Sequence, residues 1–242
     1  MKIMTFNLRN AIADDGHNSW RFRRDFAVDY MLASNADIIC MQEVVPAVKD
    51  DLAVALSNVY GIIGEGRMAE KRDDDEINLV AYKKSEFTLS GKEHFWLSET
   101  PQVPGSRYPT QLYWPRTCTH VSLKNKNGVY EVYATHLDNA DPIARERGLG
   151  LILQKAGTAG KILVCGDMND EPQNVHKWVE GKLADLTEGL EYTYNGYGKE
   201  RSKIDFIFAS RDVKKLSDCV CVPEIRGDIY ISDHFPLFVE AE

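Results

Sequence analysis

Alternating and helical patterns of apolar residues divide the first part of the chain into strands and helices. Residues Lys2 to Leu8 alternate between apolar and polar side chains, which is typical of a strand with one buried face. The following segment repeats aromatic residues every four positions, at Phe22, Phe26 and Tyr30. This spacing predicts an amphipathic helix, for which Ser19 is the expected N-cap.

The next elements follow the same logic. Residues 37–41 are a short apolar run, which predicts a buried strand. Pro46 then opens a second helix, because proline is favoured at the first helical position. We expect its buried stripe to contain four apolar residues, Val48, Leu52, Leu56 and Val59.

Strand-like segments rich in β-branched and aromatic residues dominate the rest of the chain. They are residues 77–83, 87–97, 116–123, 129–137, 161–167, 203–210, 213–222 and 236–240. The run Lys126-Asn127-Gly128 predicts a hairpin turn between two of them. Two more helices are expected, one from Asp141-Pro142 to about Lys155 and one over residues 174–181. Strands in two groups, with helices between them and no linker or internal repeat, predict one α/β domain over residues 1–242.

Charge and cysteine content restrict the kinds of protein that the chain can be. The formal net charge is −8, from 29 basic and 37 acidic residues, which disfavours non-specific binding to nucleic acid. The five cysteines are an odd number without framework spacing, so we expect reduced thiols. Cys219 and Cys221 lie two apart, but no second Cys or His pair follows, which disfavours a zinc site.

The sequence shows no segment suited to a membrane or to export. No apolar core of a signal peptide follows Met1, and no run of 18 apolar residues occurs. We therefore expect a cytoplasmic protein that does not interact with a membrane.

Polar residues that can carry chemistry stand directly after the apolar strands or inside them. Each has a plain structural alternative, such as a turn or a helix start, but a carboxylate inside the apolar run around Asp205 is expected to be paired or metal-bound. The candidates are Asn7, Glu43, His136, Asp138, Asp167, Asn169, Asp205, Asp233 and His234.

Taken together, these residues form a set suited to phosphoryl chemistry. Glu43 and Asn7 supply hard oxygen ligands, which favour Mg²⁺ or Mn²⁺ over Zn²⁺. His234 can activate water as a general base, and Asp205 can orient its imidazole. Asp167 and Asn169 can position the water and the phosphate.

The motifs TFNLR, MQEV, THLD, GDMND, KIDFIF and SDHFPL follow one another in an order that resembles the endonuclease/exonuclease/phosphatase superfamily. The resemblance spans Asn7 to Pro236, and is greatest for a small bacterial subgroup that is distantly similar to deadenylase-type domains. It implies a deoxyribonuclease-I-like α/β fold, in which a two-sheet β-sandwich is flanked by helices in four α/β/β/α layers. It also implies a site at one edge, between the sheets.

The resemblance also implies a role for each site residue. Glu43 would be the principal metal ligand, with Asn7 and Asp233 nearby. Asp167 and Asn169 would contact the nucleophile and the phosphate, and Asp205 and His234 would form a dyad. His136 would contact the phosphate or act near the leaving group. Asp167 and His234 are expected to activate the water jointly.

One position departs from a common pattern of the superfamily. Apurinic-type relatives carry an acidic residue two positions after the first Asn, where this chain has Arg9. A second acidic ligand from this strand is therefore missing, and we expect one tightly held metal. Arg9 either faces the substrate or forms a surface salt bridge.

Arg9, Arg116 and Asp138 are the candidates for substrate contact. Arg116 suits bidentate phosphate binding, although stacking on Trp114 would explain it equally well. The aromatic residues near it form either a rim over a sugar or base, or part of the core. These are Trp96, Tyr108, Tyr113 and Trp114.

The sequence favours a small phosphorylated molecule or a short single-stranded nucleic acid over duplex DNA, because its basic residues are scattered. The choice between a phosphodiester and a phosphomonoester stays open, as does the oligomeric state. A non-catalytic module that binds nucleotides or phosphate is the alternative function. Such a module should have lost one of the catalytic residues, whereas Glu43, Asp167, Asp205 and His234 are all present.

Overall fold

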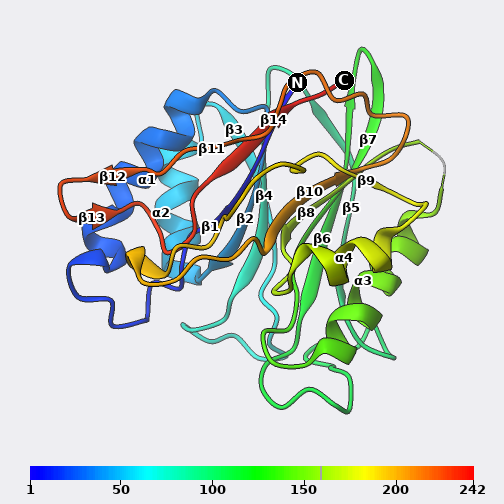
Figure 1. Ribbon diagram of the computed structural model, residues 1–242, viewed down its shortest axis with the longest axis horizontal. Helices are drawn as coiled ribbons and strands as arrows, with labels where there is room; N and C mark the ends of the chain where they lie inside the picture. The colour runs from blue at the N-terminus through cyan, green and yellow to red at the C-terminus, as the bar shows by residue number, and fades with distance from the viewer. Residues whose placement is uncertain (159) are drawn as a thin grey trace.

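The computed structural model describes residues 1–158 and 160–242, and it confirms the predicted fold class. Two β-sheets pack face to face and carry helices on their outer faces, which gives four α/β/β/α layers (Figure 1). Helices α1 (Trp20–Ser34) and α2 (Pro46–Leu56) cover the first sheet, and α3 (Pro142–Ala156) and α4 (Pro172–Val179) cover the second. Among the described residues, no helix is both long and apolar enough to cross a bilayer.

The first sheet has a parallel pair at its centre. Its strands, in spatial order, are β11 (Val220–Cys221), β14 (Leu237–Glu240), β1 (Lys2–Asn7), β2 (Ile38–Val44), β4 (Ile77–Lys83) and β3 (Tyr60–Ile63). Strands β1 and β2 run parallel, with Asn7 opposite Gln42. The C-terminal strand β14 pairs antiparallel with β1, so the two ends of the chain lie side by side.

The second sheet also has one parallel pair. Its strands, in spatial order, are β5 (Thr88–Trp96), β6 (Thr117–Asn125), β7 (Gly128–His136), β8 (Lys161–Asp167), β10 (Asp205–Ala209) and β9 (Ala184–Asp185). Strands β7 and β8 run parallel. The predicted turn joins β6 to β7, with Asn125 opposite Gly128. A separate hairpin pairs β12 (Ile225–Arg226) with β13 (Ile229–Tyr230), and short 3-10 turns occupy Gly16–Asn18 and Gly196–Gly198.

Alternation along the strands explains the layers. In β1, Ile3 faces the core between the two sheets, whereas Met4 faces the core beneath α1 and α2. In β8, Val164 packs under α3 and α4, and Cys165 lies between the sheets. Because both faces of β8 are buried, it reads as a continuous apolar run in the sequence. In β1 both faces are also buried although the sequence alternates, because the polar residues Thr5 and Asn7 are buried as well.

Several local predictions need correction. The predicted Phe26 is buried in α1, together with Trp20, Arg23, Ala27 and Met31. Phe22 is 48% exposed, because a period of four drifts away from the helical 3.6. Ser19 is the N-cap residue of α1, as predicted, but its side chain makes no hydrogen bond to the helix, and its Oγ donates to the Gly16 carbonyl instead.

Other corrections concern element ends. Val59 lies beyond the end of α2 and is exposed, so the buried stripe contains only Val48, Leu52 and Leu56. Of the strand expected over residues 213–222, only Val220–Cys221 forms. The helix expected over residues 174–181 spans Pro172–Val179, because Pro172 fits its first turn. All five cysteines are free.

Candidate active site

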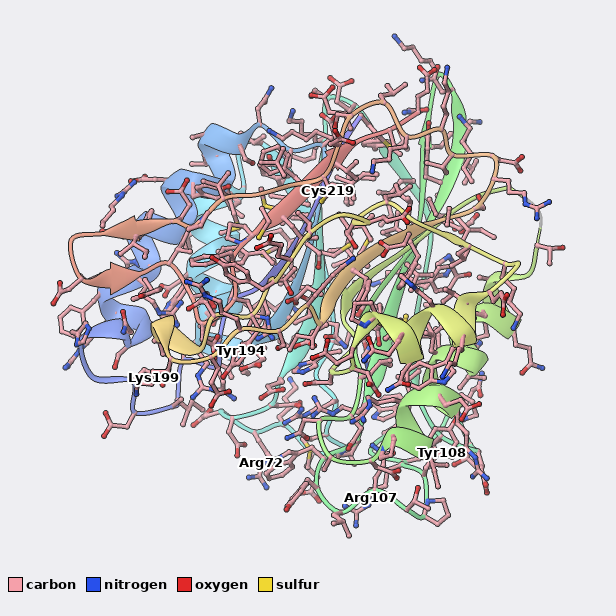
Figure 2. All side chains as sticks on the ribbon, viewed as in Figure 1. Arg72, Arg107, Tyr108, Tyr194, Lys199 and Cys219 are labelled. Carbon is pink, nitrogen blue, oxygen red and sulfur yellow. The ribbon has the colours of Figure 1, made fainter. Side chains whose placement is uncertain are left out.

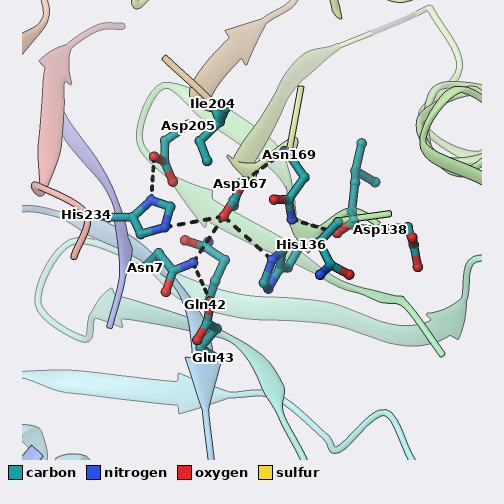
Figure 3. A network of polar contacts seen from close by, with 12 residues as sticks. Asn7, Gln42, Glu43, His136, Asp138, Asp167, Asn169, Ile204, Asp205 and His234 are labelled. Atoms are coloured by element: carbon teal, nitrogen blue, oxygen red, sulfur yellow. Dashed lines mark hydrogen bonds and ion pairs between the residues drawn. The ribbon is translucent and has the colours of Figure 1, made fainter. Parts of the chain in front are cut away.

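The site lies where strand ends of both sheets meet. Strands β1, β7 and β8 end at Asn7, His136 and Asp167, and β10 begins at Asp205. His136 and Asp205 both stand opposite Asp167 in the strand register. Neighbouring strands thus bring residues from far apart in the sequence into one cluster, at the end of the sandwich away from the chain termini (Figures 1 and 3).

A cleft of about 710 Å³ opens onto this cluster. Most of the predicted site residues line it, and three others, Asn7, Asp138 and Asp205, lie behind its surface. The predicted residues that line the cleft are Arg9, Glu43, Arg116, His136, Asp167, Asn169, Asp233 and His234.

Asp167 is the centre of the network. Its Oδ2 accepts a hydrogen bond from Asn7 Nδ2 at 3.1 Å and lies 3.6 Å from His136 Nε2 and 3.7 Å from His234 Nε2 (Figure 3). Its Oδ1 accepts from the backbone N–H of Asn169 at 2.8 Å. The side chain is 2% exposed. Asp167 therefore contacts four of the other candidates, directly or as an ion pair.

Gly166 makes this close assembly possible. Its φ is +146°, and a Cβ built there would lie 1.9 Å from the Thr135 carbonyl oxygen of β7. No side chain can occupy that space, so the glycine allows β8 to approach β7 just before Asp167.

His234 is fixed by Asp205. Its Nδ1 lies 2.8 Å from Asp205 Oδ2, which also accepts from the Thr193 hydroxyl at 2.6 Å. With Nδ1 bonded to this carboxylate, Nε2 points toward Asp167 (Figure 3). The arrangement is that of an acid–base group held by an orienting carboxylate.

The pKa values of Asp167 and His234 are both raised, but for different physical reasons. Burial raises the pKa of Asp167 to about 7, with a contribution from the charge of Asp205. Burial alone would lower the pKa of His234, but the charge and hydrogen bond of Asp205, together with Asp167, raise it to about 10. Both groups therefore take up a proton more readily than they would in water.

Glu43 is held by amide groups rather than by a cation. Its Oε1 accepts from Asn7 Nδ2 at 3.0 Å, and its Oε2 accepts from the backbone N–H of Asn10 at 2.7 Å. Glu43 has a φ of +61° at a β-bulge between Met41 and Val44. Such backbone is costly for a non-glycine residue and is common at functional sites.

The oxygens around Glu43 fit a hard divalent cation. The Glu43 and Asp167 carboxylates are joined by the Asn7 NH₂ group, whose amide oxygen accepts from the Arg9 backbone N–H at 2.9 Å, and the Asp233 carboxylate lines the same cleft. Asp167, Asp205 and His234 also lie close enough together to be ligands. In that second group the His234 imidazole is already bonded to Asp205, and a nitrogen ligand suits Mg²⁺ or Mn²⁺ less well than oxygen, so we favour the oxygen donors around Glu43.

Arg9 forms a salt bridge instead of standing free in the cleft. Its Nε donates to Asp15 Oδ2 at 3.0 Å and lies 3.6 Å from Asp233 Oδ2. The salt bridge predicted for Arg9 is therefore present, and the side chain also lines the cleft in which a substrate would bind. The positive charge of Arg9 stands beside Asp233. An acidic residue at position 9, as in apurinic-type relatives, would instead add negative charge to this side of the cleft.

Arg116 forms part of the cleft wall and does not stack on Trp114. Its Nη2 donates to Asn139 Oδ1 at 3.0 Å, and its Nε lies 3.8 Å from Asp138 Oδ2. Asp138 is 2% exposed and also accepts from the Gln111 side chain, so it lies behind Arg116 and away from the cleft surface. Trp114 instead lies over Arg67, 5.4 Å from ring centre to guanidinium carbon.

The four aromatic residues near Arg116 do not form a rim around the cleft. Trp96 and Tyr108 are buried, and the Trp96 indole donates to the Arg67 carbonyl. Tyr113 and Trp114 are exposed, but of the four only Trp114 lines the cleft.

Sequence reasoning missed several residues of the site. Arg67 and Glu76 line the cleft and form a buried ion pair at 2.6 Å, and Asn10 bonds both Glu43 and Glu76. Thr193 supports Asp205. These residues lie in loops without motif spacing, and only the buried charge of Glu76, next to the apolar strand β4, offered a signal.

The comparisons with known proteins agree with this site. The Endonuclease/Exonuclease/phosphatase family matches residues 4–234, so the chain belongs to this family, whose members are hydrolases of phosphate esters that generally use divalent metals. The superfamily expected from the sequence is confirmed. A search of curated protein sequences finds no significant match.

Solved structures extend the likeness over the whole chain. An endonuclease/exonuclease/phosphatase from Bacteroides vulgatus is 27% identical, with a TM-score of 0.91 over 100% of this chain and 98% of the other. A mannosyl-6-phosphatase from Bacteroides thetaiotaomicron is 28% identical, with a TM-score of 0.85 over 100% and 99%. The catalytic domain of human nocturnin, with bound sulfate, shares the fold at 18% identity, with a TM-score of 0.79 over 100% and 94%.

Proposed function

We propose that residues 1–242 form one catalytic domain that hydrolyses phosphate esters with the help of Mg²⁺ or Mn²⁺. The observation that carries this proposal is the position of Asp167. One of its oxygens lies within 3.7 Å of an amide and two imidazoles, on the wall of an open cleft. A water molecule there would contact groups able to take its proton.

Residues of the chain activate the water and contact the phosphate. Asp167 and His234 orient and deprotonate the attacking water jointly, and Asp205 holds the imidazole in position. Asn169 and His136 contact the phosphate or the leaving-group oxygen. These two side chains approach from the ends of neighbouring strands, opposite the Asp205–His234 pair (Figure 3).

Glu43, Asn7 and Asp233 are the residues that would hold the metal. A bound divalent cation polarises a phosphoryl oxygen and offsets the charge that develops during the reaction. The Arg9 guanidinium, 3.6 Å from Asp233, supplies a positive charge on that side of the cleft. This supports one tightly held metal rather than two.

A small phosphorylated molecule or the end of a short single strand suits the cleft best. Its volume, about 710 Å³, is that of a pocket for a small ligand. The relative from Bacteroides thetaiotaomicron is a mannosyl-6-phosphatase, which supports a small phosphorylated substrate. A related fold, TDP2 from D. rerio, has been solved with a single-strand DNA product, which keeps the second class open.

The experiment is the hydrolysis of a matched aryl phosphodiester and aryl phosphomonoester, with Mg²⁺, with Mn²⁺ and with chelator. Wild type should turn over at least one ester only when metal is present. His234→Ala should reduce this rate by on the order of 1000-fold, as for loss of an acid–base residue.

His176→Ala is the matched control, because His176 is a half-exposed imidazole that also pairs with an aspartate, Asp185, away from the cleft. It should keep the wild-type rate. Turnover that persists in chelator, or equal rates for the two histidine variants, would refute the proposal. Binding of phosphate without turnover of either ester would favour a non-catalytic module.

A further inference from the structure

Two buried arginines form a wall of the cleft that the proposed mechanism does not use. Arg67 and Arg116 are 6% and 5% exposed, and both line the cleft. Together with His136 they also line a small cavity of about 10 Å³ beside it. They come from separate segments, the loop before β4 and the residue just before β6. The fold therefore brings two guanidiniums together beside one imidazole.

Each guanidinium has few partners for its five N–H donors. Arg116 has a hydrogen bond to Asn139 and a longer contact with Asp138, whereas Arg67 pairs with Glu76 through Nη1. In the described part of the chain, the Nε of both side chains is buried without a hydrogen-bond partner. Buried charged groups are normally well paired, so this wall is arranged to receive an anion.

Trp114 restricts how that anion can approach. Its indole lies over the Arg67 guanidinium, and Trp114 also lines the cleft. Stacking occupies the flat face of a guanidinium and leaves its N–H edge free. An edge of this kind binds oxygens of a phosphate in a fork geometry.

We propose that Arg67 and Arg116 select phosphate monoesters over diesters by binding the additional charged oxygen of a terminal phosphate. The inference rests on the proposed function. In an in-line displacement at phosphorus, three oxygens surround the reacting atom between the nucleophile and the leaving group. In a monoester all three are unsubstituted and share the negative charge. In a diester one of them carries a carbon chain, which cannot accept a hydrogen bond from a guanidinium in the same way.

The reaction follows the ordinary balance of hydrolysis. The water oxygen forms a bond to phosphorus, the bond from phosphorus to the leaving oxygen breaks, and the proton lost by water is returned to the leaving alcohol. Inorganic phosphate is then the second product. The two arginines take no proton in this scheme. They contact the reacting phosphate and make its dianion the preferred substrate.

The test compares 4-nitrophenyl phosphate with methyl 4-nitrophenyl phosphate, for which the leaving group is the same. Wild type with Mg²⁺ should favour the monoester in kcat/KM. Arg116→Gln should reduce kcat/KM for the monoester by about 100-fold and for the diester by less than about threefold, because only the monoester uses the wall. Equal losses for both esters, or no loss for the monoester, would overturn the proposal.

Arg72→Gln is the matched control. Arg72 also lies near Trp114, at 5.8 Å, but it is half exposed, pairs with Asp74 and does not line the cleft (Figure 2). It should leave the ratio of the two rates unchanged. Arg116→Lys keeps the charge and the pairing with Asp138, and should restore part of the monoester rate. An Arg116→Lys variant as poor as Arg116→Gln on both esters would show that Arg116 only supports the fold.

A binding measurement separates this inference from the proposed function. Thermal stabilisation of the Mg²⁺-loaded protein by inorganic phosphate and by dimethyl phosphate requires no turnover. Inorganic phosphate should stabilise wild type more than dimethyl phosphate does, and Arg116→Gln should abolish this difference. If neither ester is hydrolysed but the difference is present, the proposed function fails and the selection of dianions stands. Equal stabilisation by the two anions would overturn the selection itself.

Discussion

Strand β2 carries one carboxylate at each end, and their surroundings are opposite. Asp37, just before the strand, accepts from the Lys2 backbone N–H at 2.7 Å and from Lys83 Nζ at 2.9 Å. Glu43, near the other end, accepts hydrogen bonds only from the amide groups of Asn7 and Asn10 among the described residues, and forms no salt bridge there. The same chemical group is thus neutralised at one end of the strand and left with excess negative charge at the other.

The difference distinguishes a carboxylate that supports the fold from one that is available for function. Two carboxylates about 4 Å apart repel by roughly 4 kcal/mol at an intermediate effective dielectric. Glu43 shares the Asn7 amide with Asp167, so this kind of repulsion acts on the pair until a cation enters. Lys83 removes the corresponding cost at Asp37.

The largest expected effect comes from exchanging each carboxylate for its amide. Glu43→Gln should lower kcat/KM by on the order of 1000-fold, or about 4 kcal/mol of transition-state stabilisation, because the proposed principal ligand is lost. Its free energy of unfolding without metal should not fall, because a negative charge is removed from a crowded site. Kinetics with an aryl phosphate and urea unfolding measure the two quantities.

Asp37→Asn should show the reverse pattern. Loss of its charged hydrogen bonds should lower the free energy of unfolding by about 1–3 kcal/mol, with activity within about twofold of wild type. The comparison fails if Asp37→Asn removes activity in the folded protein, or if Glu43→Gln is as active as wild type.

Metal binding gives the next effect. At about 100 times its dissociation constant, Mg²⁺ or Mn²⁺ should stabilise the fold by about 2.7 kcal/mol. In a domain of this size that raises the melting temperature by roughly 5–10 °C. Glu43→Gln should lose most of the shift, whereas Asp37→Asn should keep it. A wild-type melting temperature that neither metal changes would contradict a metal site at this end of β2.

A smaller effect is expected at Gly166. Gly166→Ala places a methyl group against the Thr135 carbonyl oxygen and imposes a backbone conformation that alanine rarely adopts. We expect a loss of about 1–3 kcal/mol in the free energy of unfolding, with a larger fractional loss of activity because Asp167 is displaced. Gly150→Ala is the control, because a Cβ there meets no neighbour within 4 Å. Equal melting temperatures of the two variants would show that β7 and β8 can separate without cost.

The smallest expected effect is on the pH dependence of stability, and it concerns Asp185, a second carboxylate that is neutralised by its neighbours. Burial alone would raise its pKa, but hydrogen bonds from Thr187 and His176 and the charge of Lys203 lower it below its ordinary value. A lowered pKa stabilises the fold above the ordinary value of 3.8, and this stability is lost as the pH falls through the lowered one.

The stability difference between wild type and Asp185→Asn should therefore decrease as the pH falls below about 4, by on the order of 1 kcal/mol. Urea unfolding at each pH measures it. A difference that grows as the pH falls below about 4 would show that the carboxylate does not stabilise the fold in its charged form.

Most of the fold could be predicted because its strands are buried on both faces. Residues 38–44 and 161–167 read as continuous apolar runs that end in polar residues, and the structure makes both runs strands. The end of each run marked the edge where Glu43 and Asp167 stand. The segment 213–222 misled, because its alternation is that of a strand, yet only Val220–Cys221 forms one, while Lys215 makes an isolated bridge to Ala241.

The rest of the site depends on loops that no local pattern identifies. Arg67 reaches the cleft from the loop before β4, where its carbonyl accepts from the Trp96 indole of β5, and Thr193 reaches Asp205 from a segment without regular structure. The backbone of Glu43, with φ +61°, follows from a bulge that the alternation of β2 does not reveal. Contacts made across long sequence separations cannot be read from spacing along the chain.

Ser232 joins the two ends of the chain at the site. Its hydroxyl donates to the Asn7 carbonyl, 225 positions away, and it directly precedes Asp233 and His234. During synthesis on a ribosome, Glu43, Asp167 and Asp205 emerge well before this last contact can form. A chain that has been made only as far as Ser232 thus contains most of the acidic residues of the site but has no imidazole between Asp205 and Asp167, and the proposed mechanism cannot operate until His234 has joined them.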